Sequence, residues 1–567
     1  MNINGIYHRY RKTTIIFIFA ILLLTNAVFA DESDRYNKIL EHGEELHNKG
    51  DLYGAMEIWN KGLESSRKSK NVKFEGIFTC NIALANLYVG KPQKALNLTK
   101  KAKSIAEKSG GKEVLEKSLF NMGEIENING NYKKARECYE KSLKISEETG
   151  NMKDQVRNLL GLSNIRRITG NNKKAIKLAE KSLEISRKIN YSRGKAASLY
   201  AIGGCYANFG EFNKAEEYYM QALEIAQKTG DRKYEALIFG AIGTRLMHLG
   251  KFNEGFEYKK KSMKAIEGVH DKILQVVILN GMIYSYSRKD DMKKAWKINK
   301  KALAISKEIG FKRFEGALTG EIGVLYEKEK NYIKALEHVE KALKISQKTG
   351  DKNYESYWFF VRGHINSQMR GYNRAMADYK KALSIAEKTE FKLGQCYILP
   401  EMGRVYLWLR NPVAARKSYD RALELAQQMG EKPYEAYCLG GIGGVYCYNK
   451  KFKQAEEYYG KALNIAESFD IKRSEIYFLD RIANIYSHRK KYKKAQESYE
   501  KALDLASKHN EVEWRKGLEK KLRANQENIQ KKGKFRKHLT TARMIIIPVI
   551  IILAMIIGAV IYYLRPR

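Results

Sequence analysis

Hydrophobic residues along most of the chain recur at helical spacing rather than in alternation. In residues 215–230, AEEYYMQALEIAQKTG, the side chains of Ala215, Tyr219 and Ala222 fall at positions i, i+4 and i+7, on one face of an α-helix. The next segment, residues 234–250, YEALIFGAIGTRLMHLG, continues with a second helical pattern. The pattern therefore predicts an all-α fold built from pairs of helices.

This pattern repeats with a period of 40 residues, without insertion or deletion. Residues 213–231 read NKAEEYYMQALEIAQKTGD, and residues 453–470 read KQAEEYYGKALNIAESFD. One position is small in all twelve units, and so is the position seven residues later. Because small side chains let two helices approach closely, each unit is predicted to be a packed helix pair. The first of these positions holds Ala55, Ala95, Ala135, Ala175, Ala215, Gly255, Ala295, Ala335, Ala375, Ala415, Ala455 and Ala495.

Glycine marks the predicted turns. Gly230 ends one unit and Gly250 divides the next, and glycine suits the left-handed backbone that closes a helix. Six of the twelve sites equivalent to Gly230 are glycine. Asp231, the next residue, is accordingly expected at an exposed turn. A single pair cannot bury its apolar face, so the pairs are expected to stack into an α-solenoid with one continuous core.

The repeats are predicted to span residues 35–510 as twelve helix-turn-helix units. Gly255 and Ile283 mark the least regular stretch, because Ile283 is large where the other units carry a small residue. Residues 511–530, EVEWRKGLEKKLRANQENIQ, break the period. They are predicted to form a polar capping helix with Trp514 and Leu518 turned inward.

Both ends of the chain carry apolar segments. Residues 1–30 have a basic start, a short apolar run and small residues at Val28 and Ala30, the layout of a secretory signal peptide cleaved after Ala30. An uncleaved anchor is the alternative. Residues 544–564, MIIIPVIIILAMIIGAVIYYL, carry no charge and are long enough to cross a bilayer as one helix. A short tail, residues 565–567, follows.

The charges that flank these segments disagree about orientation. An exported repeat region places the basic linker at residues 531–543, KKGKFRKHLTTAR, outside the cytoplasm, against the positive-inside preference. The first apolar segment is basic before and acidic after, which favours export. The prediction is a single-pass protein of the cytoplasmic membrane with an extracytoplasmic repeat region; a cytoplasmic repeat region is the alternative. The basic linker is then expected to contact anionic lipid head groups.

The repeat resembles the tetratricopeptide repeat family. Tyr206, Phe212, Ala215, Tyr219 and Ala222 in one unit match that family's signature, and the 40-residue period is similar to its longer-helix subgroup. The proline that often closes the second helix in that family is absent here. The resemblance implies a right-handed superhelix whose first helices line a concave groove for extended peptides or helices.

Carrying the family's groove positions over residue by residue gives a surface of aromatic, arginine and asparagine side chains. Rings would bury apolar side chains of a peptide, asparagine would hold its backbone, and arginine would pair with carboxylates. Four tyrosines spaced by 40 are expected to form a ladder along one wall, unless they merely seal neighbouring repeats. The predicted groove residues are Asn164, Arg167, Tyr200, Asn208, Asn280, Tyr284, Arg288, Tyr357, Tyr397, Arg404, Trp408, Tyr437, Tyr477 and Asn484.

Composition points to no catalytic chemistry. The 567 residues contain only 6 prolines, which fits long helices, and 6 cysteines that form no C-x-x-C pair. The histidines form no H-E-x-x-H motif, and no nucleophile elbow or nucleotide-binding loop occurs. We therefore expect no enzyme activity, no cofactor and no bound metal.

The formal net charge of +40 raises the question of nucleic acid. Lysines are interleaved with acids on the predicted outer faces, which is typical of a solvated surface, so no nucleic-acid partner is expected. The sequence thus predicts a membrane-anchored scaffold that binds peptide or protein partners in its groove. The alternative is a sensor or receptor ectodomain that works with a separate signalling protein, such as a histidine kinase.

Overall fold

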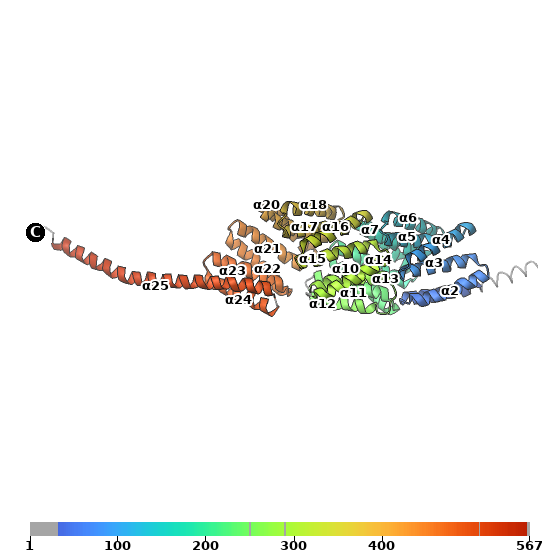
Figure 1. The fold of residues 1–567 in the computed structure, drawn as a ribbon, viewed down its shortest axis with the longest axis horizontal. Coiled ribbons are helices and arrows are strands. Elements are labelled where there is room, and N and C mark those ends of the chain that lie inside the picture. The colour runs from blue at the N-terminus through green and yellow to red at the C-terminus, as the bar shows by residue number, and fades with distance from the viewer. Residues whose placement is uncertain (1–31, 249–250, 289–290, 510, 564–567) are drawn as a thin grey trace, which may run out of the picture. The chain divides into compact units, whose positions relative to one another are not determined.

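The computed structural model describes residues 32–248, 251–288, 291–509 and 511–563 (Figure 1). All regular secondary structure within these ranges is α-helical, and none of the described residues forms a strand. The all-α prediction is confirmed. The predicted signal peptide, residues 1–30, lies outside the described residues.

The helices alternate along the chain as the first and second helix of each repeat, and a helix over residues 32–48 precedes α2 and contacts it, since a Cβ added to Gly43 would meet the Trp59 ring. The remaining first helices are α3 (Val72–Tyr88), α5 (Lys112–Ile128), α7 (Met152–Ile168), α9 (Ser192–Asn208), α11 (Arg232–His248), α13 (Lys272–Arg288), α15 (Lys312–Lys328), α17 (Lys352–Gln368), α19 (Lys392–Trp408), α21 (Lys432–Tyr448) and α23 (Lys472–His488). The second helices are α2 (Leu52–Lys68), α4 (Pro92–Ser109), α6 (Tyr132–Glu148), α8 (Asn172–Lys188), α10 (Phe212–Thr229), α12 (Phe252–Ala265), α14 (Met292–Glu308), α16 (Tyr332–Thr349), α18 (Tyr372–Lys388), α20 (Pro412–Met429), α22 (Phe452–Ser468) and α24 (Tyr492–Lys508). The last helix is α25 (Val512–Tyr563).

Helices end at residues with positive φ, and these residues recur every 20 positions along most of the described chain. Gly230 closes α10 with φ of 65°. Where glycine is missing, a polar residue takes the same backbone, as Lys450 does with φ of 58°. The prediction of an exposed side chain at Asp231 is wrong: Asp231 is 2% exposed. Its carboxylate accepts a hydrogen bond from the Tyr234 amide, capping α11, and lies 3.4 Å from Nε of Arg193 in the preceding repeat.

Small residues hold the two helices of a pair together, as predicted. Ala215 and Ala222 on α10 are fully buried. On the facing helix α9, a Cβ atom added to Gly203 would lie 2.7 Å from the Tyr219 ring and 3.1 Å from the Ala215 carbonyl oxygen. A larger side chain at Gly203 would therefore overpack the interface at a cost of about 1–3 kcal/mol.

The least regular pair is α11 with α12, in the predicted stretch. Helix α12 has 14 residues, whereas the other second helices have 17 or 18. Gly243 and Gly255 bring the two backbones together, since a Cβ on either would lie within 2.8 Å of the other's carbonyl oxygen. Ile283 on α13 is 1% exposed and contributes to the hydrophobic core.

The chain divides into two compact units. The N-terminal unit comprises residues 1–405 with 428–430, and the C-terminal unit comprises residues 406–427 with 431–567. Each unit is a stack of helix pairs, so the α-solenoid prediction is confirmed.

Within the N-terminal unit the solenoid coils back onto itself. The turns inside the first repeats pack against turns that lie about 220 residues later, or five and a half repeats along the chain. Gly90 faces Ile309, Gly130 faces Thr349 and Gly170 faces Thr389. Successive superhelical turns are therefore in direct contact.

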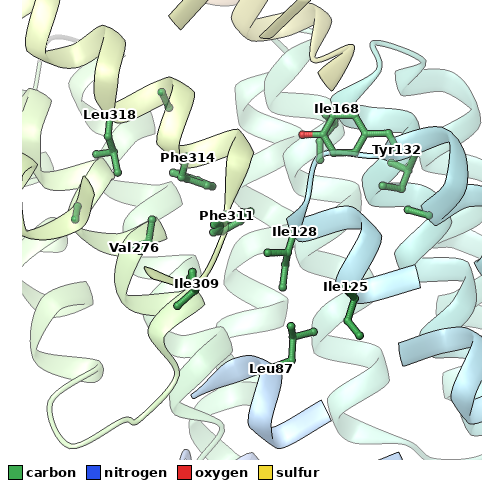
Figure 2. Packing of buried hydrophobic residues seen from close by; sticks show 14 of the residues in the cluster. Leu87, Ile125, Ile128, Tyr132, Ile168, Val276, Ile309, Phe311, Phe314 and Leu318 are labelled. Carbon is green, nitrogen blue, oxygen red and sulfur yellow. The ribbon is translucent and has the colours of Figure 1, made fainter. Parts of the chain in front are cut away.

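These contacts extend into one hydrophobic cluster. It joins residues of α3, α5 and α7 with residues of α13 and α15. Figure 2 shows Ile309, the C-cap of α14, and Phe311, the N-cap of α15, beside Ile128 at the end of α5. Burying these side chains between superhelical turns adds apolar contact that a single layer of repeats could not make.

Within the C-terminal unit, the beginning of α25 caps the last pair. Leu518 is 1% exposed and Trp514 packs against the same cluster, as predicted. Lys521 Nζ lies 2.6 Å from the buried Asp480 carboxylate, and Asn525 donates a hydrogen bond to the Tyr492 carbonyl.

Helix α25 then continues without a break through the segments predicted as cap, basic linker and membrane helix. Figure 1 shows its second half extending away from α23 and α24. The side chains of the described apolar residues from Met544 to Ile557 are exposed, Met544 by 72% and Ile551 by 51%. Among the described residues, this is the one helix long and apolar enough to cross a membrane.

Candidate functional site

The sequence-predicted groove residues all lie on first helices, the elements to which the resemblance assigns them. Thirteen of the fourteen have described side chains; Arg288 ends α13, and its side chain lies outside the described residues. Helix α7 carries Asn164 and Arg167; α9 carries Tyr200 and Asn208; α13 carries Asn280, Tyr284 and Arg288; α17 carries Tyr357; α19 carries Tyr397, Arg404 and Trp408; α21 carries Tyr437; and α23 carries Tyr477 and Asn484.

In the N-terminal unit, the candidates on α7 and α9 contact other residues of the same chain. Arg167 donates to the Asn164 side chain at 3.0 Å. Asn208 donates to Asn172 at 3.1 Å. The Tyr200 ring lies 5.8 Å from the ring of Tyr219, and burial raises the pKa of its hydroxyl. The contacts of Asn208 and Tyr200 join neighbouring helices, whereas that of Arg167 lies within α7. Whether the same side chains also bind a partner stays a prediction.

In the N-terminal unit, first helices of repeats that are far apart in the chain contact one another. Glu44, on the helix over residues 32–48, lies 3.9 Å from Lys153 Nζ at the start of α7. Lys233 Nζ, on α11, lies 4.7 Å from the centre of the Tyr88 ring on α3. Burial lowers the pKa of His47 well below its usual value, and the nearby positive charges act in the same direction. Opposite walls of the superhelix thus meet here.

A second group of candidates lies on α13 and α17. Asn280 lies close to the hydroxyl of Tyr354, whose pKa burial raises to about 12. Tyr284 is 53% exposed. Tyr357 is half-buried; burial raises its pKa well above the usual value, and the charge of Glu321 reinforces the shift. Burial also raises the pKa of Glu321 to about 7. The Tyr284 ring is thus exposed to solvent and lies near the half-buried Tyr357.

The tyrosine ladder falls partly on each unit. Tyr357 and Tyr397 belong to the N-terminal unit, and Tyr437 and Tyr477 to the C-terminal unit; all four are half-buried. The Tyr477 ring lies edge-on to Trp514 of α25, with centroids 6.2 Å apart. Tyr477 thus packs the last repeat against its cap. This is the packing role that was the alternative to ligand binding for these tyrosines.

Two further candidates in α19 and α23 hold local polar contacts. Asn484 accepts a hydrogen bond from the Tyr499 hydroxyl at 2.9 Å and donates to the Asp480 carbonyl. Arg404 pairs with Glu401, one turn earlier on α19. Both side chains are half-buried.

An exposed apolar patch in the C-terminal unit includes one predicted residue, Trp408, which is 62% exposed. Beside it along the chain stand Leu409 (39%) and Val413 (80%), at the turn between α19 and α20. A shallow cleft of about 600 Å³ runs along α20 next to Val413 and is also lined by Arg416 and Tyr446. The sequence signal for this patch is the apolar WL and PV pairs around a turn that is polar in most units.

No arrangement in the described part of the chain suggests catalysis. No group of three or more His, Cys, Asp or Glu that could hold a metal ion occurs among the described residues. Four cysteines are buried. Burial raises the pKa of the Cys80 thiol to about 12 and of Cys205 to about 11, so both are protonated and poor nucleophiles at neutral pH.

Fold and site together define an α-solenoid of helix pairs. A family model described as tetratricopeptide repeat matches residues 76–148, 154–228, 315–388 and 396–468, and a second model of the same description matches residues 476–509. These matches cover more than half of the chain, which therefore belongs to the tetratricopeptide repeat family. The irregular pair α11 with α12 falls between the matched segments.

A comparison with solved structures finds similar chains at low sequence identity. A Rap protein complexed with competence and sporulation factor is 15% identical, with a TM-score of 0.50, covering 63% of this chain and 99% of that one. The Cut9–Hcn1 hetero-tetramer of the APC/C gives 14% identity, a TM-score of 0.48 and coverage of 85% and 98%. BtubC (BKLC) from P. vanneervenii gives 20% identity, a TM-score of 0.32 and coverage of 37% and 88%. The comparison with curated proteins gives no match.

Proposed function

We propose that this protein is a membrane-tethered scaffold that binds a protein or peptide partner and performs no chemistry. The observation that carries the proposal is α25. Its first turns pack into the last repeat through Leu518, while its described apolar residues from Met544 onward are exposed. An exposed run of isoleucine and leucine of this length is unfavourable in water and favourable in a bilayer.

The segment boundaries form part of the same proposal. Residues 1–30 direct export, residues 511–530 cap the solenoid, residues 544–564 span the membrane and residues 565–567 form a short tail. The basic residues at 531–543 lie near the membrane surface, where anionic head groups attract lysine and arginine at about 1 kcal/mol per residue.

Partner binding is proposed from the family and from exposed rings. Tetratricopeptide solenoids present first-helix side chains to partners, and the Rap protein of similar fold holds a competence and sporulation factor. Among the predicted groove residues with described side chains, Tyr284 and Trp408 are the two that are more than half exposed. Large exposed rings of this kind are enriched in the centres of protein interfaces.

Membrane extraction tests the anchor. Full-length protein is expected to stay in the membrane fraction after carbonate washing, and a chain ending at residue 543 is expected to become soluble because it keeps the cap but loses the apolar run. Circular dichroism of the truncated chain checks that the repeats remain folded. Equal extraction of both forms would contradict the anchor.

Photo-crosslinking tests the partner-binding surface. A photoreactive residue at Trp408 is expected to give a defined adduct in cells, and the same residue at Lys461, exposed on the outer helix α22, is the matched control. Adducts of equal size and yield at both positions would argue against a specific surface at Trp408.

A further inference from the structure

A cavity of about 180 Å³ lies in the irregular part of the N-terminal unit, among helices α9, α11, α12 and α13. Its lining is mostly apolar, with three polar side chains besides one lysine, and includes no acidic residue. The lining residues are Tyr200, Leu237, Gly240, Ala241, Thr244, Lys259, Ser262, Val277, Ile278, Gly281 and Met282.

The lysine in this lining is buried, and none of the described residues that line the cavity is acidic. Lys259 is 7% exposed, and its Nζ donates a hydrogen bond to Thr244 Oγ1 at 2.6 Å. The same Nζ lies beside Gly281, where an added Cβ would be 3.3 Å away. An ammonium group has three donors, and one neutral hydrogen bond does not replace the water that it loses on burial. Burial accordingly lowers the pKa of Lys259 to about 8, so the side chain is mostly charged at pH 7.

Lys259 differs in residue type from the equivalent position in the other repeats. At the equivalent position seven of the other eleven second helices carry a ring, for example Tyr139, Tyr219 and Tyr379, and none of the eleven carries a charged residue. In those repeats the tyrosine ring packs against the facing first helix, as Tyr219 does beside Gly203 and Tyr379 beside Gly363. Lys259 occupies the same place with a thinner side chain, and Gly240 and Gly281 leave further space opposite it. Lys259 is thus the lining residue that departs from the repeat pattern, whereas Gly240 and Gly281 have glycine counterparts in other repeats.

We propose that this cavity binds a small organic anion, a monocarboxylate with a compact apolar body, through the ammonium group of Lys259. The carboxylate would accept hydrogen bonds from Lys259 Nζ, and the apolar body would contact Leu237, Val277 and Met282. The Thr244 hydroxyl accepts from Lys259 Nζ and donates to the Gly240 carbonyl, so it holds the ammonium group in place. A charge-assisted bond of this kind supplies the partner that the buried ammonium lacks.

The size of the cavity restricts the ligand. An apolar cavity of about 150 Å³ can hold a benzene ring, so about 180 Å³ suits a branched short-chain acid or an aromatic acid of one ring. The ammonium group is nearly closed off from solvent, which favours a free small molecule over the end of a peptide chain. The proposal is independent of the partner-binding surface and of the membrane anchor.

A ligand-observed NMR titration of the full-length chain in detergent tests the site. Sodium isovalerate at pH 7 is expected to bind, and its neutral isostere isovaleramide is expected to bind at least about ten-fold more weakly, because it cannot form the charge-assisted bond. N-acetylglycylvaline carries a branched carboxylate at the end of a chain and is also expected to bind at least about ten-fold more weakly, since the cavity has no room for the chain.

Substitutions at Lys259 distinguish binding in the cavity from effects of unfolding or of losing a surface charge. Lys259→Met and Lys259→Tyr are expected to abolish isovalerate binding while the far-ultraviolet circular dichroism stays unchanged, because both place an apolar group where a charge was buried. Lys260→Met is the matched control: Lys260 is exposed on the same helix and pairs with Glu257, so binding should be retained. The proposal is overturned if isovalerate fails to bind the native chain, if Lys259→Met binds it as well as native, or if the acetylated dipeptide binds more tightly.

Discussion

The contact between successive superhelical turns gives a prediction with an internal control. Gly130 and Gly150 both have positive φ, 77° and 70°, and they flank the same helix α6. A Cβ at Gly130 would lie 2.5 Å from Thr349 Cγ2 and 3.1 Å from Thr349 Cβ, whereas a Cβ at Gly150 would meet nothing within 4 Å. Alanine at either position strains the backbone equally, and only Gly130→Ala also clashes with the next superhelical turn.

The two costs can be separated. Alanine in the left-handed region costs about 1–2 kcal/mol at both sites. Gly130→Ala adds about 1–3 kcal/mol for overpacking, because Thr349 Cβ is fixed to its backbone and that backbone has to move. The free energy of local opening should therefore fall about 2–5 kcal/mol for Gly130→Ala, and about 1–2 kcal/mol for Gly150→Ala.

Hydrogen–deuterium exchange of the full-length chain measures this difference locally. Gly130→Ala is expected to speed exchange in two places, at the end of α5 and at the end of α16, where Thr349 is the last residue. Gly150→Ala is expected to speed exchange only near the end of α6. If both variants leave the segment around Thr349 unchanged, the superhelical turns do not pack as described.

Three other substitutions follow from single sites. Lys450→Gly should raise the free energy of unfolding by about 1 kcal/mol, measured by chemical denaturation, because lysine there holds φ of 58°. Lys259→Met should raise the free energy of unfolding by about 3 kcal/mol at pH 7, because the native chain buries a charged ammonium group. The stability of the native chain should rise between pH 8, where Lys259 loses its proton in the folded state, and pH 10.5, where it loses it in the unfolded state. The stability difference between Lys259→Met and the native chain should therefore vanish across that range. Asp154→Ala should lower the melting temperature markedly, at a cost of about 3–5 kcal/mol, since Lys117 Nζ lies 2.6 Å from that buried carboxylate. A smaller loss than in Lys38→Ala, at an exposed pair, would contradict this reasoning.

The local fold could be predicted from the sequence because its signals repeat. Small residues at Ala215 and Ala222 indicate close helix pairs, and glycines such as Gly230 indicate the caps that end second helices. Both rest on contacts within one unit, where 40 residues contain all the information. Asp231 shows the limit of this argument, because its burial depends on Arg193 in the preceding repeat.

The pitch of the superhelix could not be predicted in the same way. It depends on pairs such as Gly90 with Ile309, which lie more than five repeats apart. A signal was nevertheless present: the turns at residues 50, 90, 130, 170 and 210 are all glycine, whereas the corresponding turns at 330, 370, 410, 450 and 490 are lysine or arginine. Glycine recurs where another superhelical turn packs closely.

The candidate site was predictable in position but not in environment. The groove residues lie on first helices, yet side chains such as Tyr200 and Asn208 are engaged by their own chain. The cavity at Lys259 was missed because a lysine within a run of three lysines, at 259–261, looks like a solvated surface. Only the packing shows that Lys259 points inward while Lys260 stays exposed.

Topology tests the central claim, a repeat region tethered outside the cytoplasm, most directly. The labelling site is Lys228, whose side chain is 73% exposed near the end of α10. The native cysteines would be replaced and Lys228→Cys treated with a membrane-impermeant thiol reagent in intact cells, spheroplasts and lysed cells. The account predicts labelling in intact cells or spheroplasts, before lysis. Labelling only after lysis would contradict it and place the repeats in the cytoplasm.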